Sequence, residues 1–160
     1  MERIILGCVA IVVCTLLGKS FTSKYSQKLK YYQALQSFNF NLKTNLRFRK
    51  DNLIKLLDYE CCCKDFYLTL QSMKNCIYTD GSFCEVYFPS WFDDGDKLFL
   101  IEYLSNLGKG NSVAEMDFVD SNAEIICEKL VKIKDNNSKF TNLGKKLGLV
   151  GGIAVFVLIL

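Results

Sequence analysis

The last third of the chain has the hydrophobic spacing of one long helix. Ser112 and Glu115 form the pattern of a capping box, which predicts that the helix begins at Ser112. After Ser112, mostly apolar side chains recur at alternating steps of three and four residues, as in a coiled-coil seam. The seam positions, all apolar except an asparagine and a glycine, are Met116, Val119, Ala123, Ile126, Leu130, Ile133, Asn137, Phe140, Gly144 and Leu147.

A second seam follows the first apolar run and predicts another long helix, from Ile4 to about Phe48. Its positions are Phe21, Tyr25, Lys28, Tyr32, Leu35, Asn39, Leu42 and Leu46. At about 1.5 Å per residue this helix and the one over 112–160 each reach about 70 Å. Two helices of equal length are expected to pair antiparallel along their seams. The alternative is two ordinary amphipathic helices folded into a compact bundle.

Each end of the chain carries an apolar run that predicts a membrane anchor, over 1–18 and 147–160. A run as short as the first is also compatible with a signal peptide or with a buried helix of a soluble core. Lysines that flank the runs at 19, 145 and 146 can extend to the interface and let short runs span. The glycines at 148, 151 and 152 favour close approach of another helix, which we expect to be the first anchor.

The residues between the anchors, 19–146, are expected to form a helical domain with a small cap over 50–108. Within the cap, Asp51 is positioned to cap a helix over 52–57, and Phe66, Leu70 and Met73 share one face of another. A third begins at Asp93 and Asp94, runs through Leu98, Ile101, Leu104 and Leu107, and stops at Gly108. The aromatic segment 83–92 is interpreted as core packing. The predicted fold class is all-α: a long antiparallel helical hairpin with a small helical cap, flanked by terminal transmembrane helices.

Charge predicts the orientation of this arrangement. The formal net charge is only +3, and the lysines are scattered or adjoin the apolar runs, so no nucleic-acid partner is expected. Lysines follow the first run and precede the last, and by the positive-inside rule the middle of the chain lies in the cytoplasm.

The composition argues against catalysis and metal binding. The chain has no histidine, which excludes Ser-His and Cys-His catalysis and every histidine-containing metal site. Its eight cysteines, three of them consecutive at 61–63, include no C-x-x-C pair and are interpreted as thiols in a reducing compartment. Residues 108–112 lack the spacing of a phosphate-binding loop, and Asp93, Asp94 and Asp96 are interpreted as helix caps. We therefore predict no enzyme and no catalytic, cofactor-binding or metal-binding residues.

Four short motifs resemble stage III sporulation protein AB in their order and spacing. They are Leu6-Gly-Cys-Val-Ala-Ile-Val-Val13, Gln33-Ala-Leu-Gln36, Leu107-Gly108 and Lys146-Leu-Gly-Leu-Val-Gly-Gly152. That family is similar, in its cytoplasmic part, to the inner-membrane platform protein of type II secretion systems. The resemblance implies a structural component of the channel between mother cell and forespore, in the mother-cell membrane facing the forespore. Its implied partners are other channel proteins, including a cytoplasmic secretion-type ATPase, and possible self-association.

Two alternatives from other classes remain open. One is a secreted, disulfide-linked helical module, which requires cleavage of the first apolar run. The other is a thiol-based metal or redox protein centred on Cys61–Cys63.

Overall fold

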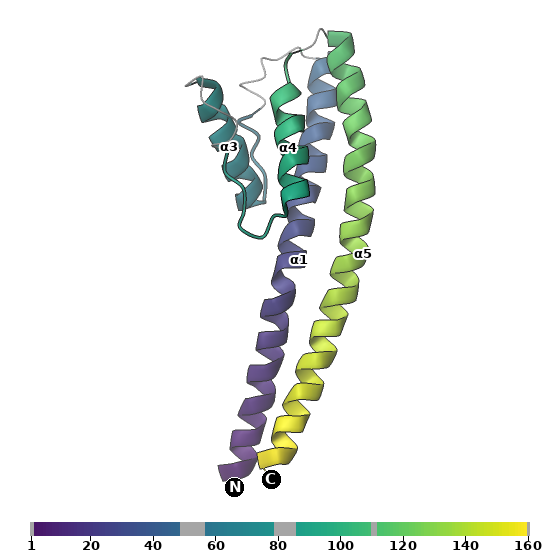
Figure 1. The fold of residues 1–160 in the computed structure, drawn as a ribbon. Helices are drawn as coiled ribbons and strands as arrows, with labels where there is room; N and C mark the ends of the chain where they lie inside the picture. The colour runs from purple at the N-terminus through teal and green to yellow at the C-terminus, as the bar shows by residue number, and fades with distance from the viewer. Residues whose placement is uncertain (1, 49–56, 79–85, 110–111, 160) are drawn as a thin grey trace. The chain divides into compact units, whose positions relative to one another are not determined.

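The structure, a computed structural model, describes residues 2–48, 57–78, 86–109 and 112–159, and in these ranges helices joined by loops are the only regular secondary structure. In these ranges lie four helices, α1 (Glu2–Phe48), α3 (Lys64–Tyr78), α4 (Asp94–Asn106) and α5 (Ser112–Ile159) (Figure 1). The side chains of residues 2–8, 10, 11, 19, 21, 47, 48, 78, 112, 145, 158 and 159 lie outside the description. Asp51 and residues 52–56 of the helix predicted over 52–57 also lie outside the described residues.

The two long helices lie within two residues of their predicted bounds and have nearly equal lengths. Helix α1 is 47 residues long and α5 is 48 residues long, and α5 continues through Gly144 without a break. The predicted start at Ser112 is confirmed for the backbone. In the part of the chain that the structure describes, this confirms the all-α fold class.

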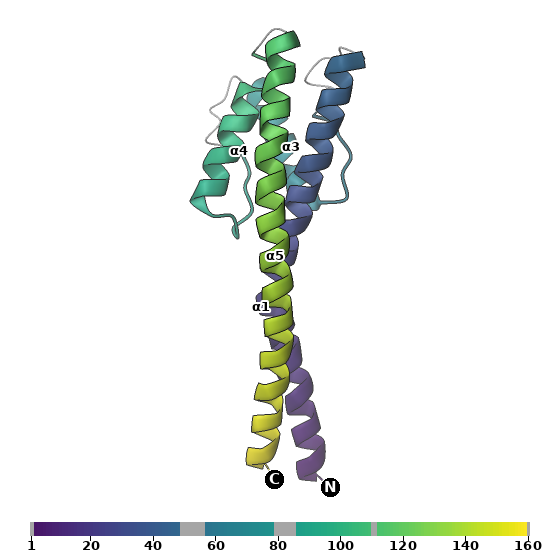
Figure 2. The same cartoon turned by 90° about the vertical axis from the view of Figure 1, so that its right-hand side faces the viewer.

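The chain divides into two compact units, which are described separately here. Unit 1 consists of residues 1–29 and 131–160, and unit 2 consists of residues 30–130. The predicted boundaries of the anchors, at 18 and 147, remain predictions. In each unit α1 and α5 run side by side in opposite directions (Figure 2).

The core of unit 2 forms where the seam of α1 meets α5. The α1 seam residues Tyr32, Leu35, Asn39 and Leu42 are buried, as are Val119 and Ile126 of the α5 seam. The predicted seams are therefore confirmed along this part of both helices.

A second buried row on α1 packs against α3, and the seam did not predict it. Tyr31 and Phe38 both meet the ring of Phe66 edge-on, with ring centroids 5.2 and 5.7 Å apart. Leu70 and Met73 continue the same face of α3, as predicted. Helix α1 is therefore covered on two sides in unit 2.

Helix α4 begins and ends where the sequence predicted, and the structure shows which of its faces is buried. Its N-cap is Asp93, as predicted, and Leu104 is buried, but Leu98 is 68% exposed. Leu100 and Tyr103 are buried instead, because the helix presents positions 96, 100, 103 and 104 to the core. Of the four apolar positions along this segment, Leu104 and Leu107 are buried in the core, whereas Leu98 faces away from it.

Within the described part of the predicted aromatic segment, 86–92, Phe92 packs into the core as predicted, whereas Tyr87 is exposed. Phe92 is buried, and its ring centroid lies 4.8 Å from that of Tyr31 and 5.0 Å from that of Trp91. The backbone N–H of Phe92 donates to the carbonyl of Pro89, which closes a turn between residues 89 and 92.

Candidate functional site

Three helices of unit 2 meet at one buried carboxylate, that of Asp96 on α4. The hydroxyl of Tyr32 on α1 donates to its Oδ1 at 2.6 Å, and the ammonium of Lys129 on α5 donates to the same atom at 3.1 Å. Burial and the neighbouring carboxylate raise the pKa of the Tyr32 hydroxyl, so it remains a proton donor. Lys129 also lies 4.9 Å from the centre of the Phe99 ring. We call Tyr32, Asp96 and Lys129 the polar lock.

A second polar contact lies within the seam itself. The amide of Asn39 donates to the backbone carbonyl of Val119 at 3.1 Å, and its Oδ1 accepts from the hydroxyl of Tyr103 at 2.7 Å. The polar seam position Asn39 is thus a buried cross-link between α1, α4 and α5. Burial raises the pKa of Tyr103. Buried polar groups paired in this way specify which helices pack together and in which register.

The connection from α4 to α5 is stabilised by a hydrogen bond to the carboxylate of Glu115. Gly108 has a φ of 80°, in the left-handed region that suits glycine after a helix. Its N–H donates to Glu115 at 2.6 Å. Glu115 therefore accepts from the end of the preceding helix, whereas the side chain of its predicted capping partner, Ser112, lies outside the description. This arrangement agrees with a helix–helix turn rather than a phosphate site.

The three consecutive cysteines lie in the loop before α3. They line one side of a cavity of about 400 Å³, whose other side is the α1 face of Lys30, Gln33, Ala34 and Ser37. Burial raises the pKa of the Cys61 thiol, which keeps it protonated at neutral pH. The described cysteines, which exclude Cys8 and Cys84, are all free thiols. No group of three potential ligands able to hold a metal occurs among the described residues.

In unit 1 the two helices touch through glycines. A Cβ added to Gly18 would lie 2.6 Å from the carbonyl oxygen of Gly144, closer than atoms can approach. A Cβ on Gly148 would lie 3.0 Å from the carbonyl oxygen of Cys14. The predicted close approach to the first apolar run is therefore confirmed for Gly148. It is wrong for Gly151, which has open space around it.

The predicted α5 seam ends at Gly144 in this unit. Tyr25 and Phe140 stack with ring centroids 4.3 Å apart, but Leu147 is 62% exposed and Gly148 is buried in its place. The contact follows steps of four residues from Gly144 because glycines, unlike leucines, let the two backbones approach closely.

Most of the large aliphatic side chains that the structure describes in unit 1 point outward, whereas Ile133 is buried. The exposed ones include Val9, Val12, Val13, Leu16, Leu17, Leu147, Leu149, Val150, Ile153, Val155 and Val157. Over Val113–Val157, α5 contains a window that is long and apolar enough to cross a membrane, with a mean hydropathy of 1.2. By length and composition the helix is thus compatible with membrane association. Much of the first apolar run lies outside the described side chains, so the anchor over 1–18 remains a prediction.

The sequence had offered no signal for the polar lock, because Tyr32, Asp96 and Lys129 lie far apart in the chain. Asp93 and Asp94 do act at the start of α4, where Asp93 accepts from the N–H of Asp96 and Asp94 pairs with Lys97. Asp96 points into the core instead. The role of Asp96 becomes visible only in the structure, where its turn of α4 is buried against both long helices.

Comparisons of the chain with protein-family models, curated proteins and solved structures gave no match.

Proposed function

We propose that this chain is a non-enzymatic, membrane-anchored structural protein whose helical unit 2 is a docking platform in the cytoplasm. One observation carries the proposal: unit 1 packs glycines inside and exposes most of the large aliphatic side chains that the structure describes there. A unit folded in water has the opposite arrangement, because burial of aliphatic side chains is its main source of stability. Lipid removes that driving force, and helices then pair through small residues.

The polar groups of unit 2 support a structural role rather than catalysis. Tyr31 donates to Thr69 at 2.9 Å, the polar lock joins three helices, and Asn39 joins the same three. These contacts hold helices in register. Such a rigid bundle suits a protein that presents a fixed surface to partners.

The finer role follows from the resemblance to stage III sporulation protein AB. We propose a component of the channel between mother cell and forespore, anchored in the mother-cell membrane through both apolar runs. Unit 2 then docks a cytoplasmic secretion-type ATPase and other channel proteins. The lysines beside the apolar runs support this orientation.

Gene deletion in the native host tests this role. We expect deletion to abolish endospore formation and the wild-type gene to restore it. A matched variant in which Asp96 is replaced by alanine should be produced in lower amounts and restore fewer spores. Normal sporulation in the deletion strain would contradict the channel role while leaving the membrane anchoring to be tested on its own.

A further inference from the structure

Unit 1 carries a concentrated positive charge. Segments 19–29 and 131–146 contain eight lysines and one acidic residue, Asp135, whereas residues 30–130 contain 15 acidic and 11 basic residues. The side chains of Lys24, Lys132, Lys134, Lys139 and Lys146 are exposed. None of these five forms an ion pair within the described part of the chain. The charge is therefore available to an external partner.

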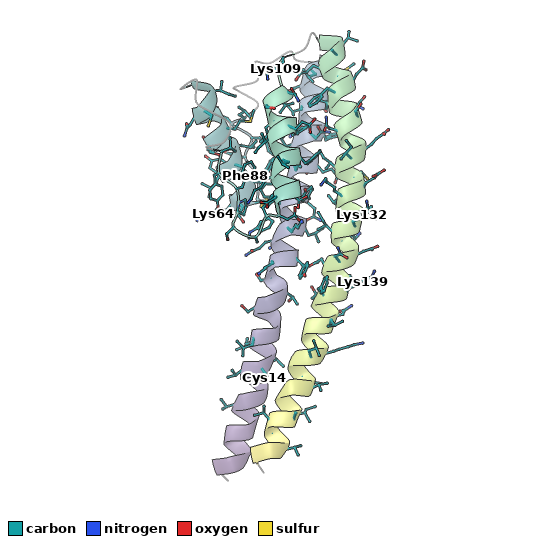
Figure 3. All side chains as sticks on the ribbon, in the orientation of Figure 1. Cys14, Lys64, Phe88, Lys109, Lys132 and Lys139 are labelled. Atoms are coloured by element: carbon teal, nitrogen blue, oxygen red, sulfur yellow. The ribbon has the colours of Figure 1, made fainter. Side chains whose placement is uncertain are left out.

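The lysines of α5 lie at graded distances from its apolar end. Lys132, Lys139 and Lys146 are spaced by seven residues and so share one face of the helix. Figure 3 labels the first two of them. Lys146 adjoins the apolar run, Lys139 lies about 10 Å farther along the axis, and Lys132 about 21 Å farther.

The lysines also surround the helix pair. Lys134 lies two residues from Lys132 and therefore on another face of α5. Helix α1 adds Lys24, six residues beyond the contact of Gly18 with Gly144. Because the helices are antiparallel, Lys24 lies at about the level of Lys139. A docked protein would cover one side of the pair, whereas a membrane surface encircles it.

We propose that these exposed lysines form a collar that binds the headgroups of anionic phospholipids around the point where the helices enter the bilayer. The lysine collar consists of Lys24, Lys132, Lys134, Lys139 and Lys146. The inference rests on the proposed membrane anchoring and specifies the lipid class that the anchor selects. Lysines next to a membrane surface each contribute about 1 kcal/mol of attraction to anionic lipid, about fivefold in the association constant. This attraction falls off over a Debye length, about 8 Å at physiological ionic strength. The contribution of the three α5 lysines therefore decreases in the order Lys146, Lys139, Lys132.

The test uses the full chain reconstituted into vesicles of mixed phosphatidylcholine and phosphatidylglycerol. Electron paramagnetic resonance of spin-labelled lipids measures which of the two associates with the protein. We expect a preference for phosphatidylglycerol that Lys146→Gln lowers by up to about fivefold, Lys139→Gln lowers less and Lys132→Gln leaves nearly unchanged. Lys64→Gln, at an exposed position of unit 2, is the matched control and should have no effect.

The outcomes separate this inference from the proposed function. Resistance of the chain to alkaline extraction reports membrane insertion independently of lipid preference. An inserted chain with no preference for phosphatidylglycerol, or with equal effects of Lys146→Gln and Lys132→Gln, would overturn the lipid collar alone and favour an acidic protein partner. A chain that is extracted would overturn the anchoring and the collar together.

Discussion

The hydroxyl of Tyr32 and the carboxylate of Asp96, 64 residues apart in sequence, form a buried hydrogen bond of 2.6 Å. The same carboxylate oxygen accepts from Lys129, so one atom joins α1, α4 and α5. Hydrogen bonds to ionised groups in a buried setting are among the stronger polar contacts in proteins.

Replacement of Asp96 by alanine should lower the free energy of unfolding of unit 2 by about 2–4 kcal/mol. The reason is that Tyr32 and the partly buried Lys129 would both lose their acceptor. Chemical unfolding of the full chain in detergent, followed by circular dichroism, measures the change. Asp94→Ala is the matched control, because its ion pair with Lys97 is exposed and should contribute less than about 1 kcal/mol. Equal stability of the two variants would contradict the role of the polar lock.

The sequence predicted the long helices well because their spacing is regular over many turns. Helices α1 and α5, the buried faces of Phe66, Leu70 and Met73, and the cap at Asp93 all follow from local periodicity and capping. Local patterns give no information about contacts between segments that lie far apart in the sequence. The roles of Tyr31, Asp96 and Lys129 depend on how α3 and α4 pack, and this is visible only in three dimensions.

The fold should lose stability steeply in alkaline solution. The folded-state pKa values of Tyr31, Tyr32 and Tyr103 are all raised above the ordinary value, in each case chiefly by burial. Stability from these groups is complete below a pH of about 10, the pKa of a tyrosine in the unfolded chain. It is lost as the pH rises further, because the unfolded state then binds fewer protons. Each tyrosine contributes a slope of about 1.4 kcal/mol per pH unit.

Circular dichroism and tyrosinate absorbance, measured together above pH 10, check this expectation. Helicity should fall as the last tyrosines ionise, and Tyr32→Phe should make the fall less steep. If all eight tyrosines ionised while the helical signal stayed constant, the three buried hydroxyls could not be shielded as the structure places them.

Replacement of Gly18 by alanine should force the two helices of unit 1 apart. The added Cβ would meet the backbone oxygen of Gly144, which cannot rotate away as a side chain can. We expect a cost of about 1–3 kcal/mol, the usual range for overpacking. Gly151→Ala is the control: it meets nothing within 4 Å and, since alanine favours helix, should be neutral or slightly stabilising.

Spin labels at Val9→Cys and Val157→Cys, with the native cysteines replaced by serine, report the separation of the helices in lipid nanodiscs. Both positions are exposed in unit 1, so the labels themselves should be tolerated. The distance distribution should lengthen or broaden for Gly18→Ala and remain unchanged for Gly151→Ala. The same distribution for both variants would show that the glycine contact does not hold the pair together.

The most direct test of the account is labelling of single native cysteines with a membrane-impermeant maleimide in intact and permeabilised cells. Cys62 and Cys127 are exposed in unit 2, and Cys14 lies in the first apolar run. The account predicts that Cys62 and Cys127 react only after permeabilisation, and that Cys14 stays protected until detergent dissolves the membrane. Reaction of Cys62 in intact cells, or recovery of the chain in the soluble fraction, would contradict a membrane-anchored protein with a cytoplasmic helical unit.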